Sequence, residues 1–215
     1  MTYLQIVNSV LRRLREDEVT SVVNNNYSNL IGDFVNEAKR KVEDSWDWGQ
    51  LRGTSQITTV SGTRRYAMSG ASYTYKILEV YNDTDNAYIE KAPYRKMNEL
   101  MTGDSALEEG APTHWAINGS NANVPYVDLW PTPDGVYSIN MNGIFPQNDL
   151  EDNGDVIQVP PAPVILLATA KAVSERGDDA GMQFGEIYND GMQALSDAIA
   201  KDAHMFNEEL VWSAN

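Results

Sequence analysis

The hydrophobic period of this chain changes twice along its length. Near the N-terminus, apolar side chains recur every three or four residues, which is the spacing of one helix face. Thr2 suits the N-cap of the first helix, and Lys39, Arg40 and Lys41 lie mostly off the apolar face of the second. The two apolar faces comprise Tyr3, Ile6, Val7, Val10, Leu11 and Leu14, and then Tyr27, Leu30, Ile31, Phe34, Val35, Ala38 and Val42.

Between about Leu51 and Pro146 the pattern becomes a series of short alternating or β-rich runs. Examples are SQITTV, YKILEVYN and YVDLW, and Gly, Asn, Asp and Pro separate them. Such runs with turn residues between them predict an antiparallel β module. One short helix interrupts it around PYRKMNELM, where Pro93 suits the first turn because its missing N–H has no partner to lose there.

Helical periodicity returns after a proline-rich stretch, Pro160, Pro161 and Pro163. The next helix is expected to begin near residues 162–164, to read VILLATAKAVSER and to stop at Gly177, a natural C′ residue. A further helix follows it. Its apolar face comprises Phe184, Ile187, Tyr188, Gly191, Leu195, Ala198 and Ile199.

A single helical hairpin is too small to bury its apolar faces alone. We therefore expect the N- and C-terminal hairpins to pack into one four-helix bundle, from which the β module projects as an insertion. The fold class is α+β. The expected parts are 1–50 and 160–204 for the two halves of the bundle, 51–159 for the β module and 205–215 for a C-terminal tail.

The stretch DSWDWGQLR marks the passage from helix to β module. Positions i and i+2 point to different faces of a helix, so Trp46 and Trp48 cannot both continue the buried stripe. We expect the helix to end at about Trp46–Trp48, with Trp46 buried and Trp48 packed against the first strand. Gly49 permits the change of direction. These three residues form the predicted hinge; the alternative is an aromatic platform for a ligand.

The balance of charges disfavours a grip on nucleic acid. The net charge is −15, from 16 basic and 31 acidic residues, whereas DNA-binding proteins cluster Lys and Arg against phosphates. The negative charge is compatible with DNA that slides past the protein, because like charges repel the DNA from the protein surface. The chain has no cysteine, no signal-peptide pattern and no apolar run long enough for a bilayer, so a soluble cytoplasmic protein is expected.

Motifs for catalysis or cofactor binding are missing. His114 and His204 are the only histidines, and no G-x-S-x-G, Walker A or dinucleotide motif occurs. The acidic stretches NDTDNAYIE and DLEDNGD resemble calcium loops, but Tyr88 and Pro160 stand where the loop needs its glycine and its final glutamate. We therefore expect no enzyme, no cofactor and no metal. A sugar site would have to use tyrosines that more often pack across strands, namely Tyr73, Tyr75, Tyr81, Tyr88 and Tyr126.

The order of several segments resembles that of a known protein family. VNEAKRKVEDSWDW is followed by QLRGTSQITTVSGTRRYAM and APTHWAI, then by LWPTPDGVYSINMNGIFP, and finally by VPPAPVILLATAKAVSERGD. This order is similar to that of the head-to-tail adaptors, or tail accessory factors, of short-tailed bacteriophages, over nearly the whole chain. RRYAMSGAS departs from the Y-x-L-P-x-D expected after the first strands, which bears on the insertion and not on the helices.

The resemblance implies a structural virion protein that forms a dodecameric ring below the portal protein. The bundle would form the ring, the β module would point toward the tail nozzle protein, and genome DNA would pass through the lumen without specific binding. The C-terminal tail would anchor on the portal, with candidate contacts at Met205, Phe206, Leu210, Val211 and Trp212. The protein would be located in the virion neck, and in the host cytoplasm during assembly, with no membrane partner.

Two other functions compete with this one. The chain could be another tail structural protein, such as a nozzle or completion protein, although nozzle chains tend to be longer and mostly β. It could also be a tail protein that binds or cleaves glycans, which would need an aromatic groove with paired carboxylates in the β module. The C-terminal tail has its own alternative, which is a short helix folded back on the bundle.

Overall fold

The computed structural model describes residues 1–215 except 69–74, 103–107, 122–123, 178–179 and 206–215. The chain divides into two compact units. A helical unit contains residues 1–51 and 147–215, and a β unit contains residues 52–146.

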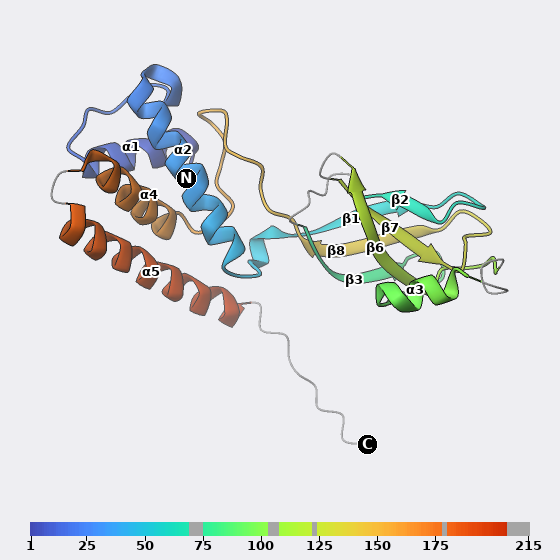
Figure 1. The fold of residues 1–215 in the computed structure, drawn as a ribbon. Coiled ribbons are helices and arrows are strands. Elements are labelled where there is room, and N and C mark those ends of the chain that lie inside the picture. Colours follow the sequence, from blue (N-terminus) through green and yellow to red (C-terminus); the bar gives the residue numbers. More distant parts are fainter. Residues whose placement is uncertain (69–74, 103–107, 122–123, 178–179, 206–215) are drawn as a thin grey trace, which may run out of the picture. The chain divides into compact units, whose positions relative to one another are not determined.

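Helices from both ends of the chain build the helical unit (Figure 1). Helix α4 packs against the other three long helices, so it is the centre of the unit. The predicted cap at Thr2 is confirmed: its hydroxyl accepts from the Gln5 backbone N–H, and the Gln5 side chain accepts from the Thr2 N–H. The helices are α1 (Tyr3–Arg13), α2 (Asn26–Asp44), α4 (Pro161–Arg176) and α5 (Ala180–Met205), with a 3-10 turn, η1 (Val22–Asn24), before α2.

The core of the helical unit lies between α1, α2 and α4. Burying these apolar side chains supplies the main favourable free energy of folding, and neither end of the chain could bury them alone. Helix α4 ends, as predicted, at Gly177 in the left-handed conformation. Fully or nearly fully buried residues are Ile6, Val7, Val10, Ile31, Val35, Ala38, Val42, Val164, Leu167, Ala168, Ala170 and Ala172.

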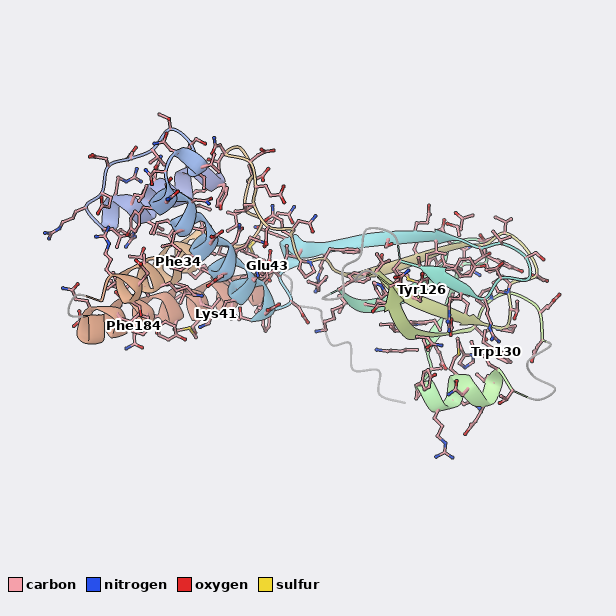
Figure 2. The ribbon with its side chains drawn as sticks, turned by 45° about the horizontal axis from the view of Figure 1, so that its top comes forward. Phe34, Lys41, Glu43, Tyr126, Trp130 and Phe184 are labelled. Atoms are coloured by element: carbon pink, nitrogen blue, oxygen red, sulfur yellow. The ribbon has the colours of Figure 1, made fainter. Side chains whose placement is uncertain are left out.

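Helix α5 packs along α4 with fewer fully buried side chains. Gly191 permits the close approach, because a Cβ atom there would lie 3.1 Å from a Leu167 methyl carbon. Leu195 is buried, whereas Ile187 and Tyr188 are half-buried. Phe184, labelled in Figure 2, stacks on Tyr188 with ring centroids 5.6 Å apart. A closed four-helix bundle therefore stays a prediction; the observed arrangement is a three-helix core with α5 laid on α4.

The β unit consists of two four-stranded sheets. One has the order β1-β8-β3-β4 and the other β2-β7-β6-β5. The strand pairs are antiparallel except β5 with β6, which is parallel. The strands are β1 (Arg52–Thr58), β2 (Arg65–Ala67), β3 (Lys76–Asn82), β4 (Ala87–Tyr88), β5 (Glu90–Lys91), β6 (His114–Asn121), β7 (Val124–Trp130) and β8 (Ser138–Ile144).

One face of each sheet contributes to the β core, as the alternating sequence pattern requires. Helix α3 (Tyr94–Leu100) follows Pro93, which is its N-cap. Its Met97 covers Ala116 of β6 with help from Ala92. The main β core comprises Ile57, Met68, Tyr75, Val80, Ile89, Trp115, Val127, Leu129, Ile139 and Met141.

The boundary of the β unit differs from the expected one. Sequence analysis assigned residues 51–159 to the insertion, whereas the compact β unit ends at Pro146. Residues 147–159 belong to the helical unit because hydrogen bonds attach them to α1 and α2, as described below. Among the described residues, no helix is long and apolar enough to span a membrane.

Candidate functional site

The chain leaves the helical unit through a tight turn at the end of α2. Helix α2 ends at Asp44, where the Ser45 hydroxyl donates to the Val42 carbonyl at 2.6 Å. The Trp48 indole N–H donates to the same carbonyl at 2.7 Å, and only 1% of Trp48 is exposed. A short 3-10 turn, η2 (Gly49–Leu51), then leads to β1. The buried ring of Trp48 therefore fixes this turn against the end of α2.

The expectation that Trp46 is the buried indole is wrong. Trp46 is 37% exposed, because α2 stops before it and it no longer follows the helical stripe. Trp48 is the buried indole instead, and its N–H donates back to α2. Helix α2 therefore ends at Asp44, before both tryptophans and slightly earlier than the sequence pattern indicated.

Asp202 near the end of α5 holds the exit turn from the other side. Its Oδ2 accepts from the Trp46 indole N–H at 3.0 Å and from the Gly49 backbone N–H at 3.1 Å. The last turn of α5 is thus bonded to two of the three predicted hinge residues. Sequence analysis did not single out Asp202, since an acidic residue on a helix gives no signal of a partner 153 residues away.

The chain returns to the helical unit at a buried ion pair on α2. Lys39 Nζ donates to both carboxylate oxygens of Glu43, at 3.1 and 3.2 Å, and to the Gln147 carbonyl at 2.6 Å. The Gln147 N–H donates back to Glu43 at 3.2 Å. The side chains of Lys39 and Glu43 are 0% and 2% exposed. Gln147, the first residue of the returning chain, therefore bonds to both charged groups.

Burial dominates the electrostatics of this pair. Desolvation raises the pKa of Glu43 above its ordinary value, although the charge and hydrogen bond of Lys39 and the Gln147 N–H act to lower it. Lys39 was expected to lie mostly off the apolar face, but its side chain is 0% exposed because the returning chain covers it. Its long stem runs under the returning chain, and Gln147 and Glu43 supply the acceptors that a buried ammonium needs.

Asn36 anchors the next residues of the returning chain. Its amide nitrogen donates to the Leu150 carbonyl at 3.0 Å, and its carbonyl accepts from the Leu150 N–H at 2.9 Å. The amide thus imitates one rung of a β-ladder. Outside it, Arg40 forms two hydrogen bonds with Asp149, at 3.0 and 2.9 Å, in an exposed position.

The rest of this return segment, residues 147–159, binds the α1–α2 hairpin. The Tyr3 N–H donates to the Asp155 carbonyl at 2.8 Å, and the Asn153 side chain accepts from the Val22 N–H at 2.9 Å. The Asp155 carboxylate accepts from the N–H groups of Glu151 and Asp152, and these bonds lower its pKa. The acidic stretch DLEDNGD is therefore a turn whose carboxylate is used by its own backbone.

The remaining candidate residues lie apart. His114 stacks edge-on against Trp130 in the β unit, and His204 is exposed near the end of α5. Tyr75 is buried in the β core and donates to the Met141 carbonyl, while Tyr81 and Tyr88 form an edge-to-face pair. Tyr126 lies on the other sheet, and Tyr73 lies outside the described residues. The described tyrosines therefore do not line one groove.

Neither a metal-binding cluster nor a catalytic pocket is found in the part of the chain that the structure describes. No group of three or more acidic or histidine side chains there could hold a metal ion. A hollow of about 460 Å³ lies between α1, η1 and α4. Its charges bind one another, since Arg176 donates to Glu16 and to the Tyr27 hydroxyl.

The predicted portal contacts fall almost entirely beyond the described residues. Met205 ends α5 and is 76% exposed. Phe206, Leu210, Val211 and Trp212 lie outside the described residues. Trp46, Trp48 and Gly49 come together at the exit turn, and the return segment is the part of the junction that sequence reasoning missed.

Comparison with known proteins identifies the family. No curated protein matches the chain. A family model described as SU10 adaptor protein matches residues 1–208, which covers both units and the connections between them. This match supports a structural phage adaptor located in the virion neck, with portal and tail components as partners. The chain belongs to the SU10 adaptor protein family.

Proposed function

We propose that this protein is the head-to-tail adaptor of a short-tailed phage, forming a dodecameric ring that joins the portal to the tail. The observation that carries the proposal is the double anchorage of the insertion. Both the exit turn and the return segment are bonded to α2, so the two connections to the β unit begin and end on the same helix. A ring component that bridges two different partners can use one compact unit for each of them.

The helical unit serves as the ring-forming body. It holds both chain ends, and α5 keeps several half-buried apolar side chains that a neighbouring copy could cover. Oligomers with cyclic symmetry bring two different faces of one subunit together, so such partly covered faces suit a ring. The four helices then act together as the predicted bundle.

The C-terminal tail is the portal anchor. It continues directly from the exposed end of α5 and carries large aromatic and aliphatic side chains at Phe206, Leu210, Val211 and Trp212. Such residues dominate the energetics of protein interfaces. Ordering the tail on the portal would make adaptor binding follow portal assembly.

The β unit binds the tail nozzle protein, and Trp46, Trp48 and Gly49 form the turn through which the chain enters it. Genome DNA passes through the lumen of the ring. The net charge of −15 supports passage without specific binding, because like charges repel DNA from the wall.

Loading on the portal tests the proposal. Purified chain is mixed with purified portal rings and analysed by mass photometry, beside a truncation after Met205 that keeps all of α5. The full chain is expected to add about twelve copies to each portal ring, following ring symmetry, and the truncated chain to add none while keeping its helical circular dichroism. A truncated chain that loads as well as the full chain contradicts the tail anchor, and a full chain that never loads contradicts the adaptor function.

A further inference from the structure

The outer face of sheet β2-β7-β6-β5 holds a half-exposed arginine on a buried carboxylate. Arg65 of β2 donates through Nε and Nη2 to Asp128 of β7, at 2.7 and 2.9 Å. The Arg65 side chain is 50% exposed, whereas that of Asp128 is 2% exposed. Among the described residues, Nη1 of Arg65 has no acceptor. The guanidinium is therefore held in one orientation with donors still directed outward.

The network around Asp128 keeps this arginine charged and fixed. Asn118 of β6 donates to Asp128 at 2.6 Å. Burial acts to raise the pKa of Asp128, but the hydrogen bonds from Arg65 and Asn118 together lower it below its ordinary value. Hydrogen bonding to Asp128 also raises the pKa of Arg65.

Two tyrosines and a second arginine accompany Arg65. Tyr126 of β7 lies opposite Ala67 of β2, two residues from both Arg65 and Asp128 along their strands, and is half-buried. Tyr94 of α3 is 58% exposed, and the electrostatic influence of both tyrosines acts to raise the pKa of Arg65. Arg64 is exposed and acts on Asp128. We call Arg64, Arg65, Tyr94 and Tyr126 the arginine–tyrosine patch. The pairing of Arg65 with Asp128 alone is explained as a cross-strand ion pair that stabilises the sheet. The presence of exposed Tyr beside Arg is typical of protein–protein interfaces.

Exposed acidic side chains lie on two loops next to strands of the sheet β1-β8-β3-β4. Asp83 and Asp85 are exposed in the β3–β4 turn, and Asp134 is exposed in the β7–β8 loop. The Asp83 N–H donates to the Ser138 carbonyl at 2.8 Å, which fixes the turn beside β8. The Tyr137 hydroxyl donates to Asp134, and this bond is the main cause that raises the pKa of Tyr137 to about 12. We call Asp83, Asp85 and Asp134 the acidic turn face.

We propose that the arginine–tyrosine patch of one copy docks on the acidic turn face of the next copy, so that neighbouring β units pair head to tail around the ring. The inference rests on the proposed ring. Cyclic symmetry places like units at one level and joins two different faces of each. A chain of net charge −15 repels its own copies, so opposite local charges are needed where they meet.

A charge exchange tests this pairing on portal rings. Arg64→Glu and Asp83→Arg alter one face each, and neither side chain holds a hydrogen bond among the described residues, so the fold is expected to be unchanged. Each single variant should need about tenfold more free chain to complete a ring, as mismatched interfacial charges weaken association. The double variant should recover most of the loss. Asn29→Glu, which adds an exposed acid on α2 of the helical unit and therefore outside both faces, should load like the unaltered chain.

Crosslinking supplies a second readout, because the chain has no cysteine of its own. A chain with both Tyr94→Cys and Asp83→Cys should form covalent ladders of many copies on portal rings when oxidised, whereas each single variant should remain monomeric. Ladders together with charge-exchange recovery support the pairing.

Three outcomes overturn it. Single charge variants that load like the unaltered chain show that the two faces do not meet. An intact ring that no longer captures the next tail protein after Arg64→Glu assigns the patch to that partner instead. Failure of the unaltered chain to load on any portal refutes the proposed function, and the inference with it.

Discussion

The buried Lys39–Glu43 pair governs how substitutions in α2 act on stability. A carboxyl whose pKa is raised by folding opposes stability fully above its folded pKa; the opposition declines as the pH falls through the folded pKa and is gone below the unfolded pKa. Glu43 is such a carboxyl, because desolvation outweighs the effect of Lys39. The pair remains in place because Gln147 supplies both a donor and an acceptor to it. Its role is to fix the return segment, and removal of one charge leaves the other buried alone.

Lys39→Met is expected to lower the free energy of unfolding by about 3–5 kcal/mol at neutral pH, the range for breaking a buried pair. The loss should shrink as the pH is lowered through the raised pKa of Glu43, since the uncompensated carboxylate then becomes neutral. Urea unfolding at neutral and mildly acidic pH measures both effects. Lys201→Met, which removes an exposed lysine of α5 without a hydrogen bond among the described residues, serves as the control. A loss from Lys39→Met that is equal at both pH values contradicts this account.

The two tryptophans at the exit turn should differ sharply in their effect on stability. Trp48→Ala removes a buried ring and its bond to the Val42 carbonyl, and should cost about 3–5 kcal/mol. Trp46→Ala removes an exposed ring and one hydrogen bond, and should cost about 1 kcal/mol. Chemical denaturation of the two variants compares them directly. Equal losses would mean that the exit turn is not built on Trp48.

At the scale of elements, the return segment buries Leu150, Ile157 and Val159 and is fixed in place by polar groups of α2 and α1. Asn36, Lys39 and Glu43 bind its backbone from α2, and α1 and η1 bind its other end through Tyr3 and Val22. This is why its membership of the helical unit could not be read from hydrophobic periodicity. By contrast, the ends of α1 and α4 followed from local rules, since Thr2 and Gly177 need only their own neighbours to form caps.

Sequence reasoning therefore succeeded where the signal is local and failed where the partner is distant. The apolar faces of α1, α2 and α4 and the alternation of the strands follow from period alone. The burial of Trp48 depends on where α2 stops, and the bond of Asp202 to Gly49 depends on how α5 is placed. Neither leaves a mark in the residue pattern, because many acidic and aromatic residues occupy equivalent positions elsewhere in the chain.

Asn36→Ala should loosen the return segment without unfolding the β unit. The Leu150 N–H and carbonyl would lose their partners, at a cost of about 1–3 kcal/mol. Hydrogen exchange followed by mass spectrometry should show faster exchange within residues 147–159 and unchanged exchange in β7. Asn8→Ala, in which another side chain loses bonds to the backbone of Val19, provides a matched control. Unchanged exchange of the return segment would contradict its anchorage by Asn36.

At the scale of the whole molecule, the chain forms a helical unit interrupted by a β unit. The strands next to the two connections, β1 and β8, are paired with Arg52 opposite Ile144, so the chain leaves and re-enters the β unit side by side. An insertion with adjacent ends can be removed without stretching the unit that carries it. The family match over residues 1–208 covers both units, so the adaptor role belongs to their combination.

Replacement of residues 52–146 by a short glycine-rich linker should leave a folded helical unit. Its core is formed by α1, α2 and α4, all of which lie outside the replaced range. The shortened chain should show helical circular dichroism and one cooperative unfolding transition. It should also load on portal rings through its C-terminal tail but fail to recruit the next tail component. A shortened chain that is soluble but unfolds without cooperativity would contradict the independence of the helical unit.

Cryo-electron microscopy of the full chain bound to its portal tests the central claim most directly. The account predicts a closed ring in which helical units contact one another, C-terminal tails lie on the portal and β units extend toward the tail. A map in which the β units bind the portal, or in which the N- and C-terminal helices belong to separate bodies, would contradict it.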